Sequence, residues 1–281
     1  MQCATHPELS AHSTCARCGA ALCDACVRTI TVSGRETMSA RLATCDRCGG
    51  IVQAIPGALR TTEKQDLEEL LRRPFDKETL MAIAAISIPW GLTAVPLPRV
   101  AALGAALYFG ALSTYYFQVV DHVGRGSKGL PFSSDMTSAH DLVRASVRGL
   151  IVCGIAVGPA LLVALLDQGN AALALFCLAF GLSCAPAAIL SIVLTNSAWN
   201  GLWPIVWAQI IARAPAAYAR LVGLYSASFL LWWIGNTTAW FFLRPVPWIG
   251  VLLSGLVNTL LTVVQALLVG HFLRRNAHRF Q

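Results

Sequence analysis

Residues 3–26, with the sequence CATHPELSAHSTCARCGAALCDAC, contain five of the ten cysteines of the chain, and two more follow in CDRC at residues 45–48. With one histidine, these seven cysteines form four pairs of metal ligands in the pattern C-x2-H-x8-C-x2-C-x4-C-x2-C-x18-C-x2-C. The eight candidate ligands are Cys3, His6, Cys15, Cys18, Cys23, Cys26, Cys45 and Cys48. Two ligands two residues apart can hold one ion from a tight turn, and Zn²⁺ prefers four thiolate or imidazole ligands. The stretch therefore predicts two zinc sites.

The spacing favours crossed over sequential ligation, because only four residues separate the second pair from the third. We expect one ion to be held by Cys3, His6, Cys23 and Cys26, and the other by Cys15, Cys18, Cys45 and Cys48. Alternative interpretations are an iron–sulfur site or reduced thiols without metal, and His12 is a possible substitute ligand. Four protein ligands per ion leave no position for a metal-bound water, so the zinc ions are expected to be structural and not hydrolytic.

Residues 3–27, CATHPELSAHSTCARCGAALCDACV, resemble the B-box type zinc finger in the form found at the start of many bacterial membrane proteins. The resemblance implies a small treble-clef-like or RING-like module that binds two structural zinc ions through crossed ligand pairs. We therefore expect a zinc-binding domain over residues 1–52. The chain departs from the family where a histidine pair usually completes the second site, since Cys45 and Cys48 stand there after a long spacer.

The chain of 281 residues is 56% hydrophobic and 12% charged, whereas charged residues make up about 25% of an ordinary soluble domain. This composition argues against a soluble enzyme, and no arrangement of residues typical of a catalytic site is recognisable. Residues 1–79 hold ten basic and ten acidic residues, and seven thiolates with two Zn²⁺ ions shift this balance to about −3. A nucleic-acid partner requires a basic surface and is not expected.

Apolar windows follow one another from about residue 79, which predicts an amphipathic linker over residues 53–78 and an integral membrane domain over residues 79–281. The windows are 80–94, 100–120, 149–166, 171–194, 221–243 and 246–272. They predict an all-α polytopic membrane bundle of about six transmembrane helices. Between the fourth and fifth windows, Trp199, Trp203 and Trp207 recur at four-residue spacing, which predicts one interfacial helix.

The distribution of basic residues predicts the orientation of the bundle. With the N-terminus in the cytosol, 14 lysines and arginines of the linker, loops and C-terminal tail fall on the cytoplasmic side, and only Arg99 and Arg244 fall outside. The start MQCATHPELS has neither the basic nor the apolar region of a signal peptide. A reducing compartment also suits cysteines that bind metal. We therefore expect a multi-pass protein of a bacterial cytoplasmic membrane with both termini in the cytosol.

Two local patterns lie before the first apolar window. The alternating stretch over residues 29–42 predicts a β-hairpin that turns near Ser33. Residues 61–73 predict a charged helix that begins with a capping box of Thr62 and Gln65.

These patterns favour a zinc-binding multi-pass membrane protein without enzymatic activity. The leading hypothesis is that the zinc finger recruits a protein partner to the cytoplasmic face of the lipid bilayer. The alternatives are a small-solute transporter or channel with a regulatory zinc finger, and a thiol sensor in which oxidation ejects zinc. No Asp, Glu, Lys or Arg lies in the middle of an apolar window, which disfavours a proton-coupled transporter.

Single cysteines introduced into a variant without native cysteines test the predicted orientation. Ser127→Cys should react with a membrane-impermeant maleimide only after permeabilisation, because residue 127 is expected in a cytoplasmic loop. Gln168→Cys should react from the outer face of intact cells. The reverse pattern of labelling would show that a span before residue 127 has been miscounted.

Overall fold

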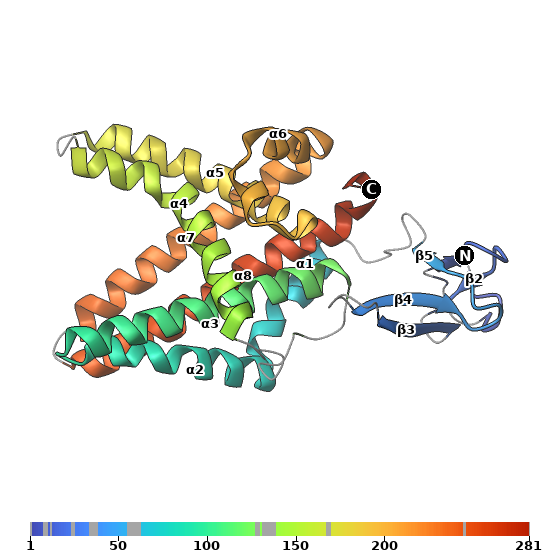
Figure 1. Cartoon of the computed structure of the whole chain (residues 1–281), viewed down its shortest axis with the longest axis horizontal. Helices are drawn as coiled ribbons and strands as arrows, with labels where there is room; N and C mark the ends of the chain where they lie inside the picture. Colours follow the sequence, from blue (N-terminus) through green and yellow to red (C-terminus); the bar gives the residue numbers. More distant parts are fainter. Residues whose placement is uncertain are drawn as a thin grey trace. The chain divides into compact units, whose positions relative to one another are not determined.

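The computed structural model describes the chain except for residues 1, 8–10, 12, 24–25, 34–38, 55–62, 127–129, 131–138, 167–169, 244–245 and 281. The chain divides into two compact units, Met1–Asp66 and Leu67–Gln281. The first unit contains the β-strands, and the second is helical (Figure 1).

The first unit has two small antiparallel sheets. The strands β1 (Ser13–Cys15), β2 (Ala21–Leu22) and β5 (Val52–Ala54) form one sheet in the order β2-β1-β5, while β3 (Val27–Ser33) and β4 (Ser39–Cys45) pair with each other. The β3–β4 register runs from Val27 opposite Cys45 to Ser33 opposite Ser39, which confirms the predicted hairpin. Its turn lies outside the described residues.

The described core of this unit consists mainly of sulfur-bearing side chains. Leu22 is completely buried, and the other residues of the cluster with almost no exposed surface are Cys3, Cys15, Cys23, Cys26 and Cys45. So small an apolar core can bury little hydrocarbon, and a unit of this size usually needs a metal or disulfides to fold.

The predicted charged helix is confirmed as α1 (Glu63–Arg72), and a short 3-10 turn, η2 (Arg73–Phe75), follows it. Leu70 is buried in the core of the helical unit, Leu67 packs against that core, and Leu71 is exposed. Thr62 and the side chain of Gln65, the expected capping box, lie outside the described part of the chain.

Proline begins many of the helices of the second unit, where its fixed φ suits the first helical position and its missing N–H is not needed. The elements are α2 (Lys77–Gly91), η3 (Leu92–Ala94), α3 (Pro98–Gly124), α4 (Ala139–Leu166), α5 (Ala171–Thr195), η5 (Trp199–Leu202), α6 (Pro204–Arg213), α7 (Pro215–Leu243) and α8 (Pro247–Phe280).

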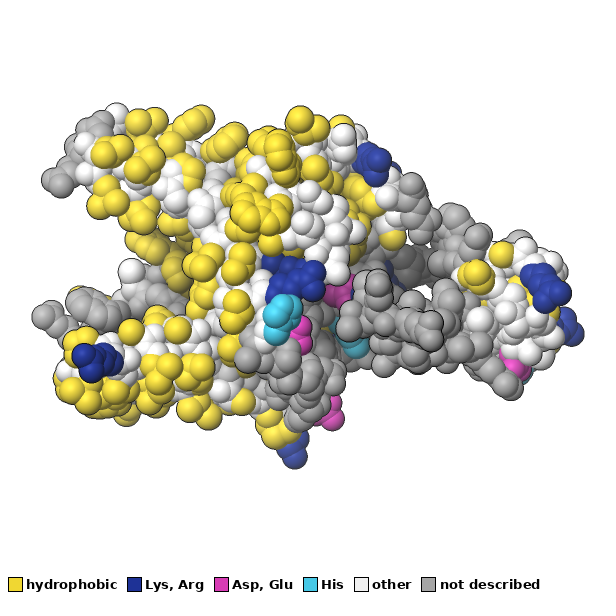
Figure 2. Space-filling view, viewed as in Figure 1, with side chains coloured by type: hydrophobic (Ala, Val, Ile, Leu, Met, Phe, Trp, Pro, Cys, Tyr) yellow, Lys and Arg dark blue, Asp and Glu magenta, His cyan; other side chains and the backbone are white. Residues whose placement is uncertain are grey.

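Among the described residues, four helices are long and apolar enough to cross a membrane. They are Pro98–Gly124, His140–Leu166, Ala171–Thr195 and Trp248–Ala277. They cover the second, third, fourth and sixth expected spans. The other two expected spans, in α2 with its 15 residues and in α7 with its 29, are not among them. Figure 2 shows hydrophobic side chains over much of the visible surface of the helical unit, as suits contact with lipid.

Helix α8 lies at the centre of the unit and packs against α2, α3 and α7. The hydroxyl of Thr259 on α8 lies 2.9 Å from that of Ser87 on α2 and 3.2 Å from that of Tyr108 on α3. Further along both helices, a Cβ placed on Gly270 would lie 2.8 Å from the Cβ of Val123. Residue numbers thus increase together along α3 and α8, and the two helices run in the same direction.

The tryptophan segment differs from the prediction of one helix. It forms η5 and α6, with a break at Trp203, whose backbone is extended (φ −94°, ψ 107°). The break has a simple cause, because Trp203 precedes Pro204 and a residue before proline avoids the α conformation. The indole N–H of Trp207 donates across the break to the carbonyl of Gly201 at 3.0 Å.

Tyr218 of α7 contributes its hydroxyl to the backbone of α5. This hydroxyl donates to the carbonyl of Ser183 at 2.6 Å and accepts the N–H of Ala187 at 3.1 Å. These two groups are four residues apart, the separation of an ordinary helical hydrogen bond. They flank Pro186, which has no N–H to donate. The tyrosine hydroxyl therefore supplies hydrogen bonds to backbone groups of α5 at the point where the proline weakens the helix.

Removing the hydroxyl in Tyr218→Phe should lower the free energy of unfolding by about 1–3 kcal/mol, because it removes the partner of two buried backbone groups. The midpoint of thermal unfolding of the full-length protein in detergent measures the effect. Tyr115→Phe is the matched control, since Tyr115 is completely buried and its hydroxyl has no hydrogen-bond partner within the described part of the chain. An equal loss of stability in both variants would contradict the role of Tyr218.

Candidate metal centres

The structure brings the eight predicted ligands together in two groups of four. Site 1 contains Cys3, His6, Cys23 and Cys26, and site 2 contains Cys15, Cys18, Cys45 and Cys48. Within each group, the ligand atoms all lie within 4.8 Å of one another. Each group combines two pairs that are distant in sequence, which is the crossed arrangement expected from the spacing. Each can hold one zinc ion.

Two similar turns supply the ligands of site 2. In CARCGA (residues 15–20) and CDRCGG (residues 45–50), the glycine after the second cysteine donates its N–H to the carbonyl of the first cysteine at 2.9 Å. Gly19 and Gly49 have φ values of +70° and +66°, a conformation that glycine adopts without steric cost. The two turns bring the sulfur atoms of both cysteine pairs together in site 2.

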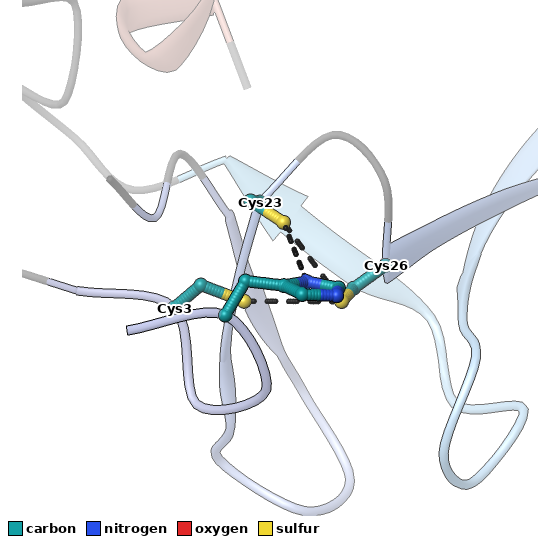
Figure 3. Close-up of side chains that lie close together, drawn as sticks. Cys3, Cys23 and Cys26 are labelled. Atoms are coloured by element: carbon teal, nitrogen blue, oxygen red, sulfur yellow. Dashed lines mark hydrogen bonds between the residues drawn. The ribbon is translucent and has the colours of Figure 1, made fainter. Parts of the chain in front are cut away.

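Site 1 has the spacing of a tetrahedral metal centre. The sulfur of Cys26 lies 3.8 Å from that of Cys3 and 3.8 Å from that of Cys23, and Figure 3 shows the three side chains turned toward one another. A tetrahedral zinc ion with sulfur ligands at about 2.3 Å separates those sulfurs by about 3.8 Å. His6 completes the group with its Nδ1 atom, 3.4 Å from the sulfur of Cys23 and 3.3 Å from that of Cys26.

Site 2 has similar dimensions. The sulfur of Cys15 lies 3.4 Å from that of Cys48, and the sulfur of Cys18 lies 4.0 Å from that of Cys45. A disulfide would require about 2.05 Å, so these cysteines are free thiols. The backbone of Gly50 approaches the site so closely that a Cβ there would lie 3.0 Å from the sulfur of Cys15. The same Cβ would lie 2.7 Å from the Cβ of Arg17, so Arg17 and the ligand sulfurs together restrict the position to glycine.

Electrostatics within site 1 favour a bound cation. Burial opposes ionisation of the Cys3 thiol, but backbone N–H groups around it, first that of Thr5, lower its pKa to about 6. Burial raises the pKa of Cys26, and the nearby sulfur atoms of Cys3 and Cys23 contribute to the increase. One thiol thus ionises readily while its neighbour keeps its proton, because two thiolates this close repel each other.

The same contrast occurs in site 2. The backbone N–H of Cys18 is the main cause that lowers the pKa of Cys15 to about 6. At Cys48, the backbone N–H of Gly50 favours the thiolate, but the neighbouring thiols and burial raise the pKa to about 11. A divalent ion at the centre of either group removes the repulsion and allows every cysteine to ligate as a thiolate. The donor set thus fits Zn²⁺.

The three remaining cysteines of the chain lie in the helical unit. His12, the possible substitute ligand, lies outside the described residues. Cys153 is in α4, and Cys177 and Cys184 are in α5. Gly50, whose lack of a side chain leaves room for Arg17 and the cysteine sulfurs, is not one of the predicted site residues. The repeated C-x2-C-G pattern points to Gly19 and Gly49, and Gly50 directly follows the second of them.

Comparison with known proteins finds no matching family model, no similar curated protein and no similar solved structure. The assignment of the metal centres therefore depends on the residues and their geometry.

Metal analysis of variants tests the two groups separately. Elemental mass spectrometry of the purified full-length protein should find two zinc ions per chain. A strong chelator should unfold the first unit. Cys23→Ser should lower the content to about one, because it removes a ligand of site 1 only, and Cys45→Ser should do the same for site 2. The double variant should contain almost none. A content that stays near two in the double variant would contradict the ligand assignment.

Proposed function

We propose that the protein is a zinc-binding multi-pass membrane protein that recruits a protein partner to the cytoplasmic face of the membrane and is not an enzyme. The observation that carries the proposal is the combination of two complete four-ligand groups with helices apolar enough to cross a bilayer. Four protein ligands complete the coordination of a structural zinc ion. The ions would therefore hold the shape of a binding surface.

The ligand arrangement supports a B-box-like, RING-like or treble-clef-like module at the N-terminus. In such modules, crossed ligand pairs bind two zinc ions, as the eight residues here are arranged to do. The two C-x2-C-G turns and the hairpin of β3 and β4 between them are consistent with this kind of fold.

The packing of the helical unit supports the proposed six spans and their orientation. Arg99 lies at the start of α3 and Arg125 directly follows its end, about 40 Å away for a helix of 27 residues. A Cβ placed on Gly126 would lie 3.6 Å from Nε of Arg274, and Arg279 donates to the carbonyl of Arg213 at 3.2 Å. Four arginines thus lie on the side where α3 ends. The positive-inside rule places that side in the cytosol.

A partner surface is available next to site 2. Ile51 exposes 56% of its side chain, while its carbonyl accepts the N–H of Ala16 at 2.9 Å and fixes its position. Arg17 and Arg47, in the middle of the two turns, are also exposed. Asp46, beside Arg47, is exposed as well. An apolar side chain among these charged residues suits a partner that presents an apolar group and complementary charges.

Cross-linking in native membranes, followed by purification of the full-length protein, tests recruitment. The wild type should retain a stoichiometric protein partner, and Ile51→Glu should reduce its yield by about tenfold or more while keeping two zinc ions. Gln2→Glu is the matched control, because it adds the same charge at another exposed position of the unit. Cys23→Ser should also lose the partner. A partner retained by both Ile51→Glu and Cys23→Ser would show that the zinc unit does not recruit it.

A second candidate function, thiol sensing, is favoured by the difference in exposure between the sites. Cys18 is exposed and Cys48 is half-buried, whereas the three cysteines of site 1 are buried. Oxidants reach exposed thiolates first. If the protein is a sensor, dilute peroxide should release one zinc ion from site 2 before the other, and Cys45→Ser should abolish this first release.

A further inference from the structure

Two arginines of α4 meet at the C-terminal end of α5. Arg144 donates from Nη2 to the carbonyl of Asn196 at 2.9 Å, and Arg148 donates from Nη2 to the same carbonyl at 3.0 Å and to Asn196 Oδ1 at 2.7 Å. Because both Nη2 atoms contact one oxygen, they lie at most about 6 Å apart. Two guanidinium groups are thus held side by side on the surface of the helical unit.

One arginine would be enough to cap this helix end. A helix C-terminus carries about half of a negative charge, whereas the two guanidinium groups carry two positive charges. Asp141 is the single carboxylate on the first turns of α4. Positive charge therefore remains after all these groups are counted.

The guanidinium groups also have hydrogen-bond donors to spare. Each has five N–H donors in a planar fork that matches the oxygens of a phosphate. The bonds to Asn196 use Nη2 of Arg144 and Nη2 of Arg148. The Nε of Arg148 is buried and has no partner among the described residues. The pair is therefore held in place through Nη2 of each arginine. The other donors of the exposed Arg144 stay available to a ligand, whereas the buried Nε of Arg148 does not.

The position of the pair along α4 corresponds to the depth of lipid headgroups. With 28 residues, α4 is about 42 Å long, which exceeds the hydrocarbon core of a bilayer by about 12 Å. Residues 149–166 alone span about 27 Å and can cross most of that core. Arg144 and Arg148 precede them and lie on one face of the helix, four residues apart.

The surroundings of the arginine pair are those of a membrane interface. Trp199 and Trp203 follow Asn196 and expose 73% and 58% of their side chains. On α4, Val147 and Leu150 are exposed apolar residues next to the arginines in sequence. Tryptophan is enriched at the level of the headgroups, and exposed aliphatic side chains suit acyl chains.

We infer that Arg144 and Arg148 form a binding site for the phosphate of an anionic phospholipid. The two guanidinium groups contact the phosphate oxygens, Asn196 holds the groups close together, and the acyl chains lie along the exposed apolar side of α4. This site is independent of the zinc-binding unit and of its proposed role in recruitment.

Native mass spectrometry of the full-length protein in detergent, titrated with dioleoyl phosphatidylglycerol, tests the site. The wild type should bind one molecule with clear preference over dioleoyl phosphatidylcholine. Arg144→Gln should weaken this binding by about tenfold or more. This variant is expected to fold, because Arg148 still donates both of its bonds to Asn196. Arg125→Gln is the matched control, since it removes one arginine at the end of α3 that is already paired with Asp121 at 2.8 Å.

The outcomes separate the possible ligands. Equal binding of the two lipids by the wild type, or unchanged binding of phosphatidylglycerol by Arg144→Gln, would overturn the proposal. Inorganic phosphate at the same concentration should not displace the lipid, and full displacement would indicate a site for free phosphate. If Arg144→Gln fails to fold, the wild-type preference between the two lipids and the displacement by phosphate still decide the matter.

Discussion

Both units of the protein are arranged around one constraint, which is that a polar or charged group removed from water must find a partner. An unpaired amide or hydroxyl in an apolar environment costs several kcal/mol by an order-of-magnitude estimate, and an unpaired charge costs far more. In the first unit the groups in question are thiols, and in the second they are backbone groups and arginines. The partners of the thiols differ from those of the backbone groups and arginines, and in both units they explain the positions of these polar groups.

In the first unit, the thiols themselves occupy the core. Their sulfur atoms are 3.4 to 4.0 Å apart, too far for disulfides and too near for several thiolates to coexist without a cation. The opposite pKa changes of Cys15 and Cys48 are the consequence of this crowding. A zinc ion in each proposed site would supply the missing positive charge and compensate for the little hydrocarbon in the described core of this unit.

In the helical unit, side chains from one helix satisfy polar groups of another. The hydroxyl of Tyr218 binds α5 beside Pro186, and two arginines of α4 donate to the carbonyl of Asn196, the residue that caps α5. Between α7 and α8, Asn236 donates to Asn258 and accepts from Ser254. Polar groups in the hydrocarbon region of a bilayer need such partners, because no water is available there to form hydrogen bonds with them.

The sequence by itself determined the features that depend on local pattern. The identity and spacing of the ligands, the hairpin of β3 and β4, the helix α1 and four long apolar helices all follow from residues close together in the chain. The one local error was the tryptophan segment, where the periodicity of the tryptophans outweighed the effect of Pro204 on Trp203. That signal was present in the sequence, since the residue before a proline is known to avoid the α conformation.

Only the tertiary structure decided which distant groups meet. The close approach of Gly50 to Cys15, the insertion of Tyr218 into α5 and the meeting of Arg144 and Arg148 at Asn196 join residues that are 31 to 52 positions apart. No periodicity or motif relates such residues, because the distance between them is set by the packing of whole helices and turns. Their chemistry was visible in the sequence, but their partners were not.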